Sequence, residues 1–527
     1  MAITWLLAGV AFAAAATQDP AGNWSSTLLT DLEAADAALR DSHPGVVDLH
    51  NPGFVAQMDG ALSLARSRAP KVDSFAGYWW AMKGYAATFN DGHVSLNPLT
   101  GAPMLPARWP GFLTGFDGDA QVVMVVDGRP GRPPLGARLL SCDGIDAEAL
   151  AARRVGDFSG RWNLQASRIH SGGEVMLEQG NPFVPVLRTC LFRVEGRQSA
   201  YTLQWLPIDT TTREARLADT RRSFRPANGW RTVPGGGYWI TTSSFNADPA
   251  TRNSQQLTEL LQQLAPVADA LQQAPRVVLD VRGNTGGASH WSIALARLIW
   301  GRTAVDALRD DSWAEWRTSD ANIAQLRGFL QALKQAPDAS PELLHMLETV
   351  TEGMAQARAQ GQPLWREPAD TSAGQVRPPA PGVPDRSGRV VIVADASCGS
   401  ACLDALDLWK RLGALQVGVE TSADSVYMDI RPQPLPSGLS RISVPMKVYR
   451  GRGRGSNEPY APDRRYEGDM RDTQALEAWI REGRELIEAD RNPRPAQRWL
   501  RITRPAATAP GSSRAAWTDS PVARTPG

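Results

Sequence analysis

The chain lacks a net charge that could draw it to a polyanion. Its 56 Lys and Arg residues are balanced by 55 Asp and Glu residues, which leaves a formal charge of +1 over 527 residues. Binding to nucleic acid needs a basic field, because contacts to phosphates supply much of the affinity. We therefore expect no nucleic acid among its partners.

Long apolar runs are also absent, except near the start of the chain. Residues 3–16 form an alanine-rich stretch that is shorter than the ~20 residues of a membrane-spanning helix. Its length and its small residues before Thr17 are typical of a signal peptide, although no basic residue precedes the stretch. We expect a signal peptide over residues 1–16, a periplasmic or secreted protein, and no other membrane segment. The alternatives are a cytoplasmic protein with an apolar start and a retained anchor.

Cysteine is scarce, with four residues in all. Cys142 and Cys190 fall in one predicted domain and are the better candidates for a disulfide. Cys398 and Cys402 flank Ser400. Two alternatives stay open for them, a disulfide between the two or a free Cys402 that acts as a nucleophile. The spacing gives no zinc-site pattern, and nucleotide-loop motifs are missing. Neither a metal nor an organic cofactor is expected.

The most informative segment that is present surrounds Ser400. Residues 389–394 form an apolar run typical of a buried strand, and residues 401–412 have the period of an amphipathic helix. A serine at such a turn lies beside N–H groups of the first helical turn, which could hold an oxyanion. The plain alternative is that Ser400 caps the helix, the commonest role of a serine in this position.

Two further segments carry residues suited to chemistry. An apolar strand at residues 277–281 ends in polar residues and the pair Gly286-Gly287, where backbone can approach a ligand closely. His93 lies in the segment 89–96 and is suited to take a proton from a serine near neutral pH. His290 is a second candidate for this role, whereas His43 has the surroundings of a turn residue.

The order of these segments resembles the tail-specific (C-terminal-processing) serine peptidase family, from about residue 28 to residue 481. The resemblance has four motifs in the family's order. They are D-x-R-x-N-x-G-G at residues 280–287, S-A-x-x-D at 400–404, which is similar to the family's S-A-x-E/D nucleophile turn, G-x-x-T at 418–421 and E-x-x-x-P-D at 458–463.

The family has two catalytic branches. One uses a lysine base downstream of the serine, but residues 421–426, which stand in that region, contain no lysine. The other branch, similar to the tricorn core and to retinoid-binding-protein-like modules, takes a histidine from a D-x-H segment and a distal glutamate. This resemblance implies that Ser400 is the nucleophile, His93 the base and Glu458 the distal acid.

One position departs from the tricorn-like pattern. The tricorn core has a serine directly before the histidine, and Gly92 stands there in this chain. The orientation of His93 is therefore open between Glu458, Asp91 and a water molecule. For the oxyanion hole, we expect the backbone N–H of Ala401 and that of Gly286 or Gly287.

The predicted fold class is multidomain α/β. Residues 25–105 have helical periodicity, and residues 106–207 have the short strands of a β-rich module that resembles a PDZ domain, with any other small β domain as the alternative. Residues 230–500 alternate strands and helices, for which the resemblance implies a crotonase-like (ClpP-like) catalytic domain. A helical insertion at about 301–379 is either a lid or a surface excursion, and residues 505–527 are typical of a disordered tail.

The function expected from these residues is that of an exported serine endopeptidase. It would cleave peptide bonds in peptides or unfolded protein tails through an acyl-enzyme, so its expected partner is such a substrate. Two alternatives stay open. One is a catalytically inactive peptide- or ligand-binding relative, and the other is a serine esterase, although the esterase motif G-x-S-x-G is absent. The sequence gives no oligomeric state.

Overall fold

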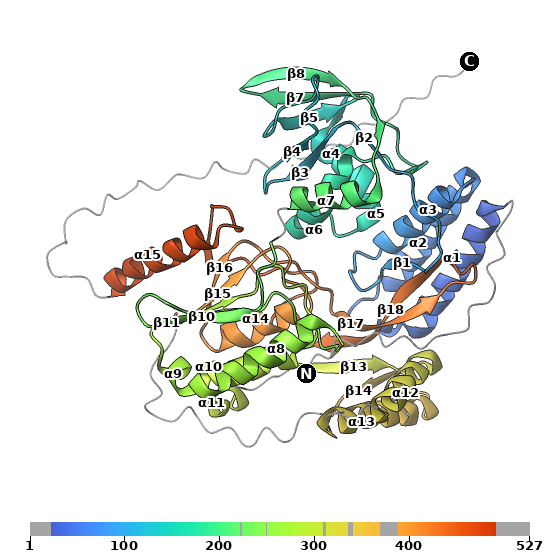
Figure 1. Ribbon diagram of the computed structural model, residues 1–527. Helices are drawn as coiled ribbons and strands as arrows, with labels where there is room; N and C mark the ends of the chain where they lie inside the picture. The colour runs from blue at the N-terminus through green and yellow to red at the C-terminus, as the bar shows by residue number, and fades with distance from the viewer. Residues whose placement is uncertain are drawn as a thin grey trace, which may run out of the picture. The chain divides into compact units, whose positions relative to one another are not determined.

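The computed structural model describes residues 23–221, 224–248, 250–308, 312–335, 341–368 and 388–491. The expected signal peptide and C-terminal tail lie outside these ranges. The chain divides into two compact units, residues 1–471 and 472–527. The second unit contributes one described helix, α15 (Thr473–Arg491), which Figure 1 labels near the C-terminal end of the coloured chain. All other described elements belong to the first unit.

A six-stranded sheet forms the part that carries Ser400. Its order is β10-β11-β12-β15-β16-β19, and all neighbours from β11 to β19 run parallel, while β10 is antiparallel. Every residue of β12 and β15 is buried, as in parallel strands covered on both faces. The strands are β10 (Gly229–Val233), β11 (Gly237–Thr241), β12 (Val277–Asp280), β15 (Val390–Ala394), β16 (Leu415–Gly418) and β19 (Arg464–Arg465).

Helices cover this sheet because each presents one apolar face. In α8, for example, Leu257, Leu260 and Leu264 are buried at helical spacing. They join a core that includes Trp409 of α14 and Ile392 of β15. The covering helices are α8 (Arg252–Leu264), α9 (Ala268–Gln273), α10 (His290–Trp300), α11 (Arg302–Asp306) and α14 (Ala401–Arg411).

A second sheet is built around the long strand β18 (Ser440–Arg450). Its order is β1-β18-β13-β14, and β17 (Tyr427–Pro434) also pairs with β18. Strand β1 (Leu96–Pro98) pairs with β18 from Ser440 to Ile442, so residues about 340 positions apart meet. This pairing fixes the backbone that begins three residues after His93.

Three N-terminal helices pack on the second sheet (Figure 1). They bury Leu32, Met58 and Tyr78 in one core with Ile442 and Val444 of β18. The helices are α1 (Trp24–Ser42), α2 (Phe54–Arg68) and α3 (Phe75–Ala87). The N-terminal helices are therefore part of one packed body with a strand from near the end of the first unit.

The insertion after α11 contains strands as well as helices. Strands β13 (Trp313–Arg317) and β14 (Leu364–Arg366) extend the second sheet, and helices α12 (Asp320–Lys334) and α13 (Pro341–Ala359) pack on it. The hydroxyls of Ser319 and Ser42 are 2.9 Å apart, which anchors the insertion on α1. The sequence predicted the helices but not the strand pair.

The β-rich module contains a six-stranded antiparallel sheet with the order β3-β4-β5-β7-β8, to which β6 adds by pairing with β5. A disulfide joins Cys142 of β5 to Cys190 of β7. The strands are β2 (Arg108–Trp109), β3 (Phe112–Phe116), β4 (Gln121–Val126), β5 (Arg138–Cys142), β6 (Ile145–Asp146), β7 (Thr189–Val194), β8 (Arg197–Thr202) and β9 (Leu206–Pro207), and the helices are α4 (Ala147–Ala151), α5 (Asp157–Ser159), α6 (Gln165–Ser171) and α7 (Thr210–Arg221).

The expected mixture of helices and several sheets is confirmed. In the described ranges, no helix combines the length and the apolar character needed to cross a membrane.

The disulfide in the β-rich module should stabilise this sheet. Replacing both Cys142 and Cys190 by alanine should lower the free energy of unfolding by about 2–5 kcal/mol, because the bridge restricts the unfolded chain. Urea unfolding, followed by amide exchange in β5 and β7, measures the change. The double alanine variant of Cys398 and Cys402 is the comparison. That bridge spans 4 residues rather than 48, so an equal or larger loss there would contradict the prediction.

Candidate active site

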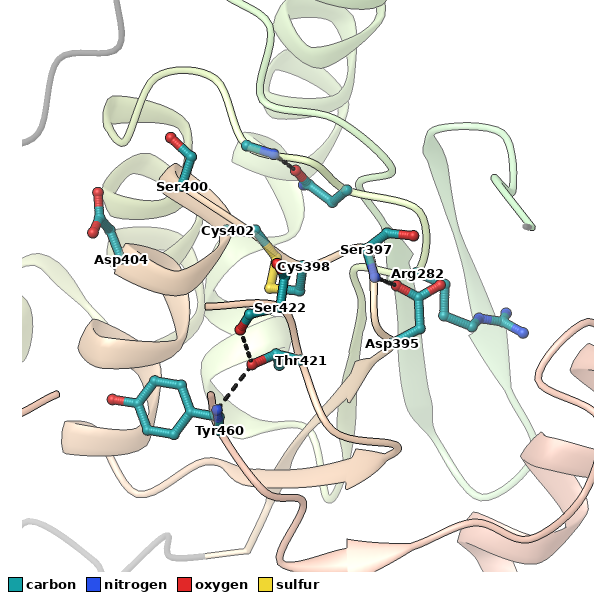
Figure 2. Close-up of a disulfide and its surroundings, with 12 residues drawn as sticks. Arg282, Asp395, Ser397, Cys398, Ser400, Cys402, Asp404, Thr421, Ser422 and Tyr460 are labelled. Atoms are coloured by element: carbon teal, nitrogen blue, oxygen red, sulfur yellow. Dashed lines mark hydrogen bonds between the residues drawn. A yellow bond between two sulfur atoms is a disulfide. The ribbon is translucent and has the colours of Figure 1, made fainter. Parts of the chain in front are cut away.

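Ser400 lies at the turn between β15 and α14 in a rare backbone conformation. Its φ is +54° and its ψ is −129°, a combination that costs a residue other than glycine about 1–3 kcal/mol. Its side chain makes no capping hydrogen bond to the helix. Figure 2 shows Ser400 at the start of the helix with its hydroxyl pointing away from the Cys398–Cys402 disulfide. The hydroxyl is thus not used as a helix cap.

A disulfide brackets this serine. Cys398 and Cys402 are bonded to each other and are fully buried, and the bridge lies below the Ser400 turn in Figure 2. It links the residue two positions before the serine to the residue two positions after it. Cys402 therefore has no free thiol, so the alternative that Cys402 is the nucleophile is wrong.

The D-x-R-x-N-x-G-G segment forms the turn that packs against Ser400. Asp280 and Arg282 form a buried ion pair at 2.5 Å, and the Asn284 side chain accepts the Gly286 N–H at 2.9 Å. Gly286 has a φ of +99°, and a Cβ at this position would lie 2.7 Å from the Cβ of Ser400. Only glycine allows this approach.

Two backbone donors are available beside Ser400. Among the described residues, the N–H groups of Ala401 and Gly287 have no hydrogen-bond acceptor. The N–H of Gly286 is occupied by Asn284, which removes Gly286 from the expected oxyanion donors. The backbone of Phe245 fixes the Gly286-Gly287 turn, because the Ala288 N–H donates to the Phe245 carbonyl at 2.7 Å.

Asp395 connects the glycine turn to the serine turn. Its carboxylate accepts the N–H of Gly283 at 3.0 Å and the N–H of Ser397 at 2.9 Å. Burial raises the pKa of Asp395 to about 6, against the lowering effect of these two hydrogen bonds. The turns that follow β12 and β15 are thereby held at one edge of the sheet.

His93 lies between α3 and β1, next to a fixed carboxylate. Its Nδ1 is 3.4 Å from Oδ1 of Asp91, and its backbone N–H donates to the same oxygen at 2.8 Å. Burial lowers the pKa of His93, but the contact and charge of Asp91 and the charge of Asp424 outweigh burial, so the pKa is raised above its ordinary value. Asp91 is thus the acidic group nearest to Nδ1, although Nδ1 makes no hydrogen bond at this distance.

Two adjacent residues, Asp424 and Ser425, connect the serine turn to the histidine. The Asp424 carboxylate accepts the Ser400 N–H at 2.6 Å, and the Ser425 hydroxyl donates to Oδ2 of Asp91 at 2.8 Å. Neither residue is predicted from the sequence. They stand in the region where the other branch of the family has its lysine, which is the signal that could have identified them.

Glu458 is placed near this site, but its carboxylate is used elsewhere. Its Oε2 accepts the N–H of Gly455 at 2.8 Å in an exposed turn. The neighbouring Asn457 donates its side-chain amide to the Asn90 carbonyl at 2.7 Å. In the described part of the chain, the carboxylate in contact with His93 is that of Asp91 and not that of Glu458.

The other histidines considered have different surroundings. Nδ1 of His43 accepts the Gly45 N–H at 2.9 Å, and burial lowers the pKa of His43 to about 4. His43 is a turn residue, as predicted. His290 is exposed, and its ring lies 4.5 Å from that of Trp291.

The two lysines nearest in sequence to the expected position of a lysine base are both paired. Lys410 forms an ion pair with Asp463 at 2.8 Å, and the buried Lys447 forms one with Asp429 at 2.7 Å. Asp463 belongs to the E-x-x-x-P-D segment, and the hydroxyl of Thr421 in G-x-x-T accepts the N–H of Tyr460 at 2.9 Å (Figure 2). These two motifs hold each other in place.

Comparison with known proteins shows the fold. No family model and no curated protein matches the chain. Among solved structures, CPAF complexed with lactacystin matches with 13% identity and a TM-score of 0.56, over 88% of this chain and 98% of that chain. Mature CPAF gives the same identity and TM-score over 89% and 99%. A serine-to-alanine mutant of CPAF matches with 12% identity and a TM-score of 0.55, over 89% and 98%.

The chain shares the fold of CPAF. The likeness extends along nearly the whole chain of CPAF, so it includes the helical, β-rich and α/β parts together. At 13% identity, this similarity shows the fold and does not show the role of any residue. The tail-specific family and its histidine branch remain predictions from the motifs.

The close approach of Gly286 to Ser400 gives a first test of the site. Gly286→Ala should reduce the rate at which a fluorophosphonate labels Ser400 by at least about 10²-fold, because a misplacement of about 1 Å can cost that much. Thr285→Ala is the matched control, since Thr285 is exposed. Peptide mapping of the labelled protein measures the rate. Equal loss in both variants would show that the Gly286 contact has no special role.

The raised pKa of His93 gives a second test. A neutral His93 is needed as base, so Ser400 labelling should fall as the pH drops through a pKa above about 6.5. Asp91→Asn removes a carboxylate that raises this pKa, so the acid limb should move to lower pH. Glu458→Gln should leave the limb in place. A limb that moves in Glu458→Gln and stays in Asp91→Asn would assign the orienting role to Glu458.

Proposed function

We propose that the chain is a serine-type peptidase that cleaves peptides or unfolded protein tails through an acyl-enzyme. One observation carries this proposal. Ser400 is held in a strained turn with its hydroxyl uncapped, while Asp424 and Ser425 tie that turn to the carboxylate beside His93. Strain of this kind persists where the surrounding structure enforces it, and it is typical of catalytic turns.

The proposed reaction gives each of these groups one role. The Ser400 hydroxyl attacks the scissile carbonyl, and His93 takes the hydroxyl proton. The N–H groups of Ala401 and Gly287 are donors for the resulting oxyanion, and the loss of one such donor typically costs about 10²–10³-fold in turnover. His93 then returns the proton to the leaving amine. A water molecule next attacks the acyl carbonyl and gives a proton to His93, and the bond to Ser400 breaks as His93 returns that proton to the serine oxygen.

The surroundings of His93 and of the nearby lysines support a histidine base, as in the branch that resembles the tricorn core. His93 has a carboxylate at its Nδ1 side, as a catalytic imidazole requires to fix its tautomer. Lys410 and Lys447 are both held in ion pairs. Asp91 is the orienting acid in this proposal. Glu458 would instead stabilise the turn at Gly455, whose neighbour Asn457 binds the carbonyl of Asn90.

We also propose that the protein works in an oxidising compartment, either periplasmic or secreted. All four cysteines are in disulfides, and such bonds persist mainly outside the reducing cytoplasm. The apolar segment 3–16 is consistent with export.

The deciding experiment compares single variants on peptide and ester substrates. Ser400→Ala should abolish hydrolysis and labelling by a fluorophosphonate, and His93→Ala should reduce turnover by at least about 10²-fold. Lys410→Ala and His290→Ala are controls that should keep near-normal turnover.

Each rival function predicts a different result. A folded wild-type protein that is neither labelled nor active would indicate a binding relative. Hydrolysis of esters without any cleavage of peptides would indicate an esterase. Activity that survives in Ser400→Ala would show that another group is the nucleophile.

A further inference from the structure

Arg161 belongs to the β-rich module but reaches the residues that flank the candidate active site. It lies between α5 and α6, with a φ of +50°. Its backbone N–H donates to the side chain of Asn90 at 2.9 Å, and Nη1 donates to the Ala423 carbonyl at 2.6 Å. Asn90 precedes Asp91, and Ala423 precedes Asp424. The module therefore holds a guanidinium beside the residue that precedes Asp424, and its backbone binds the residue that precedes Asp91.

The glycine before His93 makes room for this cation. A Cβ on Gly92 would lie 2.8 Å from Nη2, 2.9 Å from Cζ and 3.0 Å from Nη1 of Arg161. The space that a side chain would fill at this position is thus occupied by the guanidinium. This explains in structural terms why the chain departs from the tricorn-like pattern at Gly92.

Neither Asp91 nor Asp424 forms an ion pair with the guanidinium of Arg161. Within the described ranges, no carboxylate lies within 4.0 Å of the guanidinium, and its only hydrogen bond is to Ala423. An arginine has five N–H donors, which match a carboxylate in a two-pronged arrangement. The side chain is half-buried and so remains open to solvent. Its charge acts on His93, whose pKa it lowers against the effect of the two acids.

We propose that Arg161 binds a carboxylate of the substrate on the leaving-group side of the scissile bond. This inference rests on the proposed function, because it is the transfer of a proton from His93 to the leaving amine that assigns the His93 side to the departing fragment. The carboxylate has two sources in a peptide. It is either the α-carboxylate at the end of the chain or the side chain of an aspartate or glutamate.

The experiment measures cleavage of a dodecamer library synthesised in two forms, with a free C-terminal carboxylate and with a C-terminal amide. Mass spectrometry gives kcat/KM for each cleaved peptide. A second arm replaces Glu by Gln at positions C-terminal to the cleaved bond in the amide series. The ratio of acid to amide, or of Glu to Gln, cancels any general effect of a substitution on His93 or on Ser400.

Arg161→Gln should lower kcat/KM about 10- to 100-fold for the carboxylate-bearing peptides and much less for their neutral partners, with the loss mainly in KM. Arg161→Lys should retain part of the preference, because it keeps the charge but not the two-pronged geometry. Gly92→Ser should reduce the same ratio by displacing the guanidinium. Arg197→Gln, which changes an exposed arginine on β8 of the same module, should leave the ratio unchanged.

The outcomes distinguish a failure of the Arg161 proposal from a failure of the peptidase proposal. If wild-type protein cleaves peptides but Arg161→Gln leaves both ratios unchanged, the inference is wrong and the peptidase proposal stands. If no peptide is cleaved, the binding arm decides. The folded Ser400→Ala protein should bind fluorescent peptide acids about 10-fold or more tightly than their amides. The same comparison of Glu and Gln peptides tests the side-chain source, and equal binding in both comparisons would overturn the role of Arg161.

Discussion

The short hydrogen bond between the Ser400 N–H and the Asp424 carboxylate is the contact on which the site depends. At 2.6 Å and with a charged acceptor, it belongs to the stronger class of hydrogen bonds. It acts on the backbone of a residue whose φ of +54° is unfavourable without support. Below the turn, the Cys398–Cys402 disulfide restrains the same few residues from the other side. Strain is therefore kept by two independent restraints, one polar and one covalent.

The same segment explains how distant parts of the chain make one site. Ser425, next to Asp424, binds Asp91 from the N-terminal part, and the pairing of β1 with β18 fixes the backbone just beyond His93. The Ser443 N–H donates to the Ser95 carbonyl at 2.9 Å and continues this pairing. The histidine is thus positioned by residues more than 300 positions away, so the N-terminal helices are a structural part of the site rather than an appended domain.

The parts of the site that could be predicted from sequence are those that local patterns encode. The apolar strand and amphipathic helix around Ser400 predict the turn, and Gly286-Gly287 predicts a close backbone approach. Arg161 could not be predicted in this way, because its role arises from tertiary contacts that leave no local period or motif. Asp424 also lacks a local pattern, and only its place in the region of the other branch's lysine could have identified it. Gly92 was visible as a departure from a pattern, but the guanidinium that occupies its space comes from another module. The Gly286 N–H was a reasonable oxyanion donor until the structure showed Asn284 bound to it.

The charges around His93 form a balanced set. Asp91 and Asp424 raise the pKa of His93, while burial and Arg161 lower it, and partial burial keeps these effects strong. A base is most effective when its pKa lies near the working pH, so a neighbouring cation that limits the rise has a chemical use. A substrate carboxylate on Arg161 would neutralise that cation and let the pKa of His93 rise further. Occupation of the Arg161 position would thus act on His93, which couples recognition of a carboxylate to the chemistry at Ser400.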